Sequence, residues 1–120
     1  MALHMEVRPR GHVMILHCKG RLVYRDETAA FSQKVGELLE RRHPLVVDFT
    51  ALDTIDSAGL GELVLLHMWA QTSNRSIRLA NPNSKVRHLL KITNLLSVLF
   101  VYATLEEAVN ASTRDLARPA

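Results

Sequence analysis

The stretch that decides the fold is Leu45-Val46-Val47-Asp48-Phe49, followed after three intervening residues by Asp53-Thr54-Ile55-Asp56-Ser57-Ala58-Gly59-Leu60-Gly61. The first five residues are apolar or β-branched apart from one aspartate, a composition typical of a strand buried within a sheet. The apolar residues that follow the serine continue to about residue 72 and predict a helix. A buried strand that leads into a helix is a building unit of α/β proteins.

Upstream of this stretch, the pattern predicts a hairpin and an amphipathic helix. Strands are expected at residues 4–7 and 13–16, joined by a type I turn at residues 8–11, where proline and glycine take their favoured places. A helix is then expected over about residues 27–42, ended by Pro44. Its apolar residues recur at helical spacing, at Phe31, Val35, Leu38 and Leu39.

Downstream, strands and helices continue to alternate. Strands are expected at residues 77–80 and 98–102, with a helix between them that Asn83 or Ser84 can cap. Thr104, followed three residues later by Glu107, has the spacing of a capping box for a fourth helix. The order predicts an α/β domain with a mixed five-stranded sheet, antiparallel in the opening hairpin and otherwise mostly parallel. We expect one domain over residues 1–120, with its core at about 4–117.

Composition narrows the class of function. The chain has 120 residues and one cysteine, Cys18, so no internal disulfide can form and a reducing cytoplasm is expected. No N-terminal segment resembles a signal peptide, and no apolar run approaches the roughly 20 residues of a membrane span. The charge of +3 is scattered, and aromatic residues make up only 5% of the chain, too few to stack on nucleic-acid bases. We therefore expect no membrane span and no direct nucleic-acid partner.

No pattern of residues indicates catalysis, a metal or a cofactor. The six histidines lack metal-ligand spacing. Residues 57–61 superficially resemble a phosphate-binding loop, but Glu62 stands where the lysine is required, and the Gly-x-Ser-x-Gly motif of hydrolases is absent. Asp48, Asp53 and Asp56 are interpreted as turn and capping residues. The sequence thus predicts a protein that is not an enzyme and has no cofactor.

Ser57 lies where the buried strand gives way to the second helix. Its hydroxyl is expected to cap that helix, contributing about 1 kcal/mol, and capping alone is the simplest interpretation. Gly59 and Gly61 favour a further role, because glycine in the first turn either opens the backbone to another molecule or lets a second segment pack close. The helix is also apolar around most of its circumference, so one side is expected either to dock a partner or to be buried by neighbouring elements.

Residues 45–61 strongly resemble the STAS domains of bacterial anti-sigma factor antagonists, which carry a buried strand followed by Asp-Ser-Ser/Thr-Gly-Leu-Gly. The resemblance covers nearly the whole chain. Gly20 matches the family's glycine after the second strand, residues 83–90 resemble the opening of its third helix, and residues 105–109 resemble its final helix. The resemblance implies a STAS fold.

The resemblance also implies a phosphorylation switch. In the family, the serine after the aspartate is phosphorylated by a kinase that also sequesters a sigma factor. The unphosphorylated antagonist binds that kinase and frees the sigma factor, and a phosphatase resets the cycle. The implied partners are an anti-sigma factor serine kinase and a PP2C-type phosphatase, with other STAS proteins or a second copy as further candidates. The phosphoacceptor would be Ser57, within a partner surface of Asp56, Ala58, Gly59, Leu60, Gly61, Arg21 and Val23.

Some positions depart from the family pattern. Gly20-Arg21-Leu22-Val23 stands where many relatives have Gly-Glu-Leu-Asp, which changes charge and polarity near the switch. Ala58 replaces a second hydroxyl, so one acceptor remains, and Asn94 replaces a common glycine, which is mild because asparagine tolerates left-handed backbone. The alternative is a STAS subunit that never cycles through phosphate, such as a stress-signalling scaffold or an accessory subunit of a lipid-transport ATPase.

Overall fold

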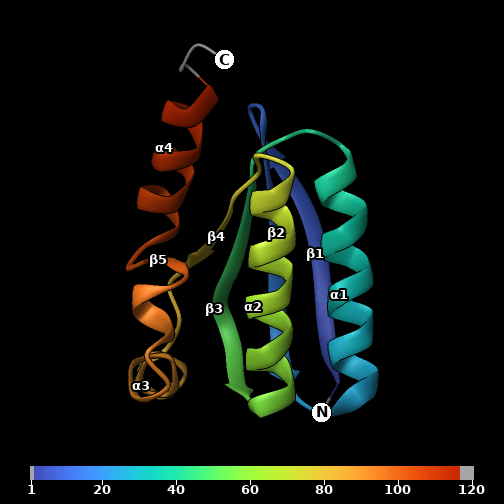
Figure 1. Ribbon diagram of the computed structural model, residues 1–120, viewed down its shortest axis with the longest axis vertical. Helices are drawn as coiled ribbons and strands as arrows, with labels where there is room; N and C mark the ends of the chain where they lie inside the picture. The colour runs from blue at the N-terminus through green and yellow to red at the C-terminus, as the bar shows by residue number, and fades with distance from the viewer. Residues whose placement is uncertain (1, 117–120) are drawn as a thin grey trace.

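Strands and helices alternate along the chain and assemble into one sheet covered by helices (Figure 1). The structure is a computed structural model that describes residues 2–116. The strands lie side by side in chain order, β1 (Leu3–Arg10), β2 (Val13–Leu22), β3 (Leu45–Ile55), β4 (Ile77–Ala80) and β5 (Phe100–Tyr102). Only β1 and β2 pair antiparallel, and the other neighbours pair in parallel. The predicted mixed five-stranded sheet is confirmed.

The helices form two layers. They are α1 (Tyr24–Glu40), α2 (Ser57–Thr72), α3 (Ser84–Ile92) and α4 (Leu105–Leu116), with a short 3₁₀ turn at Leu95–Ser97. The larger core joins the sheet to α1, α2 and α3, and α1 and α2 lie side by side across it (Figure 1). A smaller core lies under α4, where Val13, Ile15 and Val46 meet Ala108 and Val109. Adjacent residues of β2, such as Ile15 and Leu16, belong to different cores because successive side chains of a strand point to opposite faces.

The predicted caps of the later helices are confirmed. Oδ1 of Asn83 accepts the backbone N–H of Val86 at 2.8 Å and caps α3. Oγ1 of Thr104 accepts the backbone N–H of Glu107 at 3.1 Å at the start of α4. Asn94 adopts left-handed backbone with φ 63°, as expected for a position where glycine is common in the family.

Several predicted boundaries are wrong. β2 and β3 extend to Leu22 and Ile55, well beyond the predicted ends at residues 16 and 49. Their later residues include half-buried and exposed positions among the buried ones, so no continuous apolar run marks them as strand. β5 begins at Phe100, two residues later than predicted, because the 3₁₀ turn uses the preceding segment. Residue 117, the end of the predicted core, lies outside the described residues.

The opening turn is also shifted. Residues 8–10 were expected to turn, but they continue β1, and the turn consists of Gly11 and His12. Gly11 has φ 60°, which glycine supplies at low cost in a two-residue hairpin. Pro9 pairs opposite Met14 inside β1, a position that an edge strand tolerates because one side of the backbone needs no partner.

Candidate protein-binding site

The candidate site is built where β3 ends and α2 begins. Asp56 has extended backbone and caps α2, because its Oδ1 accepts the backbone N–H of Gly59 at 2.9 Å. The prediction that Ser57 is the cap is therefore wrong by one residue. Aspartate caps helices as well as serine does, and the carboxylate of Asp56 reaches the amide of Gly59, the third residue of the helix. Ser57 is thus the first residue within the helix.

The Asp56 carboxylate caps two helices at once. Its Oδ2 accepts the backbone N–H of Tyr24, the first residue of α1, at 2.9 Å. Val23, which precedes α1, makes no capping bond with its side chain, so Asp56 supplies one from 32 residues away. The N–H groups of Tyr24 and then Gly59 lower the pKa of Asp56, because they stabilise the ionised carboxylate. The junction thus fixes a negative charge between two helix N-termini.

Ser57 lies on the solvent side of this junction. Its side chain is exposed, and within residues 2–116 no group forms a hydrogen bond with its hydroxyl. Ala58 and Gly61 are exposed beside it. The amides of the first turn give this end of α2 a partial positive charge, which favours an anionic group attached here.

The two glycines of the first turn differ in their surroundings. A Cβ on Gly59 would lie 2.8 Å from the backbone oxygen of Leu22 and 2.7 Å from Cγ1 of Ile55, so only glycine fits there. A Cβ on Gly61 would meet nothing within 4 Å. Of the two roles proposed for these glycines, close packing therefore applies to Gly59 and an open surface applies to Gly61.

The remaining residues of the predicted partner surface divide by burial. Leu60 is 8% exposed and Val23 is 6% exposed, so both shape the site from beneath and offer little to a partner. Arg21 is half-buried at the end of β2, opposite Thr54 of β3. Arg21 and Asp56 thus lie at the same end of the sheet, where β2 and β3 finish.

Sequence reasoning missed two residues at this site, Tyr24 and Arg25. Tyr24 is 65% exposed and has φ 64°, a left-handed conformation that a tyrosine rarely adopts. Arg25 lines a shallow hollow together with Ala58 of α2. Periodicity predicted that the helix begins at about residue 27, three residues later than it does, so it did not mark Tyr24 and Arg25 as helical. The hydrogen bond from Tyr24 to Asp56 is what brings the start of α1 to this site.

The outward side of α2 is apolar and exposed. Leu65, Met68 and Trp69 are 61%, 56% and 48% exposed, whereas the side toward the sheet is buried. Of the two expectations for the broad apolar face, exposure therefore holds for this side. It adjoins the turn that carries Ser57, so an apolar surface and the serine lie on one helix.

The other two aspartates of the stretch are strand residues, so their interpretation as turn or capping residues is wrong. Asp48 is 7% exposed within β3, where its Oδ1 accepts the N–H and hydroxyl of Thr50 and its Oδ2 lies 2.7 Å from Nδ1 of His17. Asp53 is exposed in the same strand, 3.7 Å from Nζ of Lys85. Among the described residues, no cluster of three histidine, cysteine or acidic side chains could hold a metal ion.

Comparisons with solved structures show the same fold. A candidate anti-sigma factor antagonist of Thermotoga maritima is 24% identical, with a TM-score of 0.82 over 91% of this chain and 94% of that chain. The phosphorylated form of the Bacillus cell fate determinant SpoIIAA is 19% identical, with a TM-score of 0.66 over 92% and 98% of the two chains. A sulfate transporter family protein of Wolinella succinogenes is 12% identical, with a TM-score of 0.73 over 91% of each.

The described residues contain no helix that is both long and apolar enough to cross a membrane. The family model described as the STAS domain matches residues 4–108, which include all of the sheet except Leu3 and also the start of the last helix. The chain therefore belongs to the STAS domain family.

Proposed function

We propose that the chain is an anti-sigma factor antagonist whose binding is controlled by phosphorylation of Ser57. In its unphosphorylated state it binds an anti-sigma factor serine kinase in the cytoplasm and releases the sigma factor, and a PP2C-type phosphatase restores that state. The observation that carries the proposal is the exposed Ser57 at the start of α2, whose hydroxyl forms no hydrogen bond with any residue that the structure describes. The likeness to SpoIIAA, an anti-sigma factor antagonist solved in unphosphorylated and phosphorylated forms, supports it.

The junction is suited to a switch that leaves the fold intact. A phosphoserine adds a charge of about −1.5 to −2, which the first-turn amides of α2 accept. Asp56 is already ionised beside it, so phosphorylation creates a concentrated negative charge on the surface. A partner that fits a neutral serine then meets repulsion and a desolvation cost, so its affinity falls while the chain stays folded.

The test uses the serine-kinase-type anti-sigma factors encoded in the same genome. The purified chain is incubated with each kinase and ATP, and phosphate is located by mass spectrometry. We expect phosphate on Ser57 of the wild type and none on Ser57→Ala. Binding of the matching kinase should weaken by at least about a hundredfold in Ser57→Asp, because a charge at an interface costs several kcal/mol. Phosphate on another residue, or on none, contradicts the proposal.

A second candidate is a STAS subunit that never cycles through phosphate, such as a stress-signalling scaffold or an accessory subunit of a lipid-transport ATPase. The exposed apolar side of α2 favours it, because a permanent assembly would cover that surface. The same Ser57→Asp variant separates the two candidates. Partner binding that is unchanged by the substitution supports the permanent subunit, and a large loss supports the switch.

A further inference from the structure

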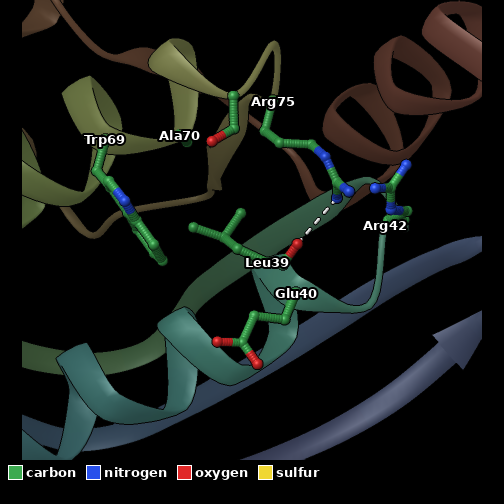
Figure 2. Close-up of a pocket in the computed structure, with 7 residues that line it drawn as sticks. Leu39, Glu40, Arg42, Trp69, Ala70 and Arg75 are labelled. Atoms are coloured by element: carbon green, nitrogen blue, oxygen red, sulfur yellow. Dashed lines mark hydrogen bonds between the residues drawn. The ribbon is translucent and has the colours of Figure 1, made fainter.

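A hollow lies between the C-terminal ends of α1 and α2, at the opposite end of α2 from Ser57. Figure 2 shows Trp69 on one side of Leu39. The guanidinium groups of Arg75 and Arg42 lie on the other side of that leucine (Figure 2). The hollow has a volume of about 320 Å³, at the lower end of the range for small-molecule sites. It therefore has room for one aromatic ring and a small charged group.

One side of the hollow is apolar. The ring of Trp69 points toward α1 in Figure 2 and is 48% exposed, so much of it stays open to a ligand. Leu39 and Ala70, which are 6% and 2% exposed, form an apolar floor beside it. An indole ring stacks on other flat groups and contributes a large apolar surface. This side of the hollow therefore favours a flat, apolar group.

The other side of the hollow is cationic. Nη1 of Arg75 donates a hydrogen bond to the backbone oxygen of Leu39 at 3.0 Å, the contact that is dashed in Figure 2. A guanidinium group has five N–H donors, so most of those of Arg75 stay available. Within residues 2–116, neither Arg42 nor Arg75 forms an ion pair with a carboxylate. Two like charges thus share one hollow without a described counter-charge.

The carboxylates near this hollow do not neutralise the two arginines. Glu40 lines the hollow, but its carboxylate points away from both guanidinium groups in Figure 2. Asp115, which lines the adjoining hollow, forms an ion pair with Arg78. The cationic side of the hollow therefore keeps its attraction for an anion.

The C-terminal ends of the two helices also carry partial negative charge, which would oppose an anion if their carbonyl groups were open. Here hydrogen-bond donors already cover these groups. The backbone oxygen of Leu38 accepts the N–H of Arg41, and the oxygen of Ala70 accepts the N–H groups of Ser73 and Arg75. The carbonyl groups at this end are therefore largely compensated by the chain itself.

The backbone of Arg42 gives a second, independent sign of a site. Its φ of 62° is left-handed, at a position after a helix where glycine or asparagine is usual. After α2, the comparable conformation belongs to Asn74, with φ 56°, and asparagine tolerates it. An arginine is strained there, and residues held in strained backbone cluster at binding sites. With this backbone, Arg42 lines the same hollow as Arg75.

We propose that this hollow binds a phosphate monoester that carries an aromatic ring. The ring packs against Trp69, and the phosphate lies between Arg42 and Arg75. A phosphate monoester carries up to two negative charges, and each guanidinium group can form paired hydrogen bonds with its oxygens. Because Ser57 lies at the other end of α2, the inference goes beyond the proposed function and does not rest on it.

The experiment uses phenyl phosphate as the probe and the fluorescence of Trp69 as the readout. Trp69 is the single tryptophan of the chain, so a change in emission reports binding beside it. We expect a saturable change with a dissociation constant of about 1 mM or below, as is usual for a ligand of this size. Phenol lacks the charge and inorganic phosphate lacks the ring, so each should bind at least about fivefold more weakly in competition. No saturable change, or equal binding of all three compounds, overturns the inference.

Neighbouring arginines test where the phosphate binds. Arg42→Gln should weaken the binding of phenyl phosphate at least about fivefold, because it removes one of the two guanidinium groups. Arg41→Gln is the matched control, since Arg41 is also exposed but does not line the hollow. Its affinity for phenyl phosphate should stay within about twofold of the wild type. Equal effects of the two substitutions would mean that the probe senses only the net charge and would contradict the site.

Arg42→Asn separates binding from folding. Asparagine tolerates left-handed backbone, so the melting temperature should equal or exceed that of the wild type. The affinity for phenyl phosphate should nevertheless fall as far as it does in Arg42→Gln. Unchanged affinity would exclude Arg42 from the site. A loss of affinity together with a lower melting temperature would show that Arg42 serves the fold and would overturn its assignment to a ligand.

Discussion

The first turn of α2 has an inward side and an outward side, and the two are built on different principles. The inward side, with Asp56 and Gly59, is fixed by short contacts to α1 and to the ends of β2 and β3. On the outward side Ser57 and Gly61 are exposed, and a Cβ on Gly61 would meet no described residue within 4 Å. Within one turn, the sequence therefore specifies the fold on one side and leaves the other free for a partner.

Gly59→Ala is the strongest test of the close packing on the inward side. The added Cβ would lie 2.8 Å from the backbone oxygen of Leu22, which cannot move without shifting β2. We expect the free energy of unfolding to fall by about 3 kcal/mol, in the upper range for overpacking. Urea denaturation followed by circular dichroism measures the change. A loss below about 0.5 kcal/mol would mean that the turn is not held closely against the strand.

The second test removes the shared cap. Asp56→Ala loses the hydrogen bonds to Tyr24 and Gly59, so we expect a loss of about 2 kcal/mol, roughly 1 kcal/mol for each helix. Asp56→Asn keeps one acceptor oxygen and should lose about half as much. If the two variants are equally stable, the carboxylate does not join the two helices.

The same carboxylate predicts a dependence of stability on pH. Its pKa is lowered in the folded state, mainly by the N–H of Tyr24, so its contribution is present above its ordinary pKa of 3.8 and is lost as pH falls through the folded value. Denaturation of the wild type and Asp56→Asn between pH 5 and pH 2 should show converging stabilities. A constant difference over that range would contradict the assignment.

The inward and outward sides also differed in how well the sequence predicted them. The order of elements followed from hydrophobic periodicity, and Ser57 followed from a local motif whose exposure the fold then revealed. Tyr24 and Arg25 did not follow, because a bond across 32 residues places them at the site. The end of β3 was missed for a related reason, since its last residues form no continuous apolar run and pairing with β2 marks them as strand.

The inward side of α2 also carries a buried histidine, His67, further along the helix. His67 is 4% exposed, and no other described residue bonds to its Nδ1, while its ring meets Phe100 edge-on at 5.3 Å. Burial lowers the pKa of His67, because the charged imidazolium loses water there. The unfolded chain therefore takes up a proton first, and stability should decrease as pH falls below 6.5 toward the folded value. His67→Gln, which does not titrate, should remove this slope in urea denaturation between pH 7.5 and pH 5.

A substitution on the outward side should change stability least, and it should stabilise the protein where the inward substitutions destabilise it. Gly61→Ala adds a methyl group into open space, so the gain in helix propensity should raise the free energy of unfolding by up to about 1 kcal/mol. The same methyl group stands beside Ser57, where we propose that the kinase approaches, so kinase affinity should fall while stability rises. A position that acts only through the fold would lower both quantities together, as we expect for Gly59→Ala. Opposite signs in the denaturation and binding measurements therefore identify Gly61 as a place kept open for the partner, and a stable variant with unchanged affinity would place the contact elsewhere.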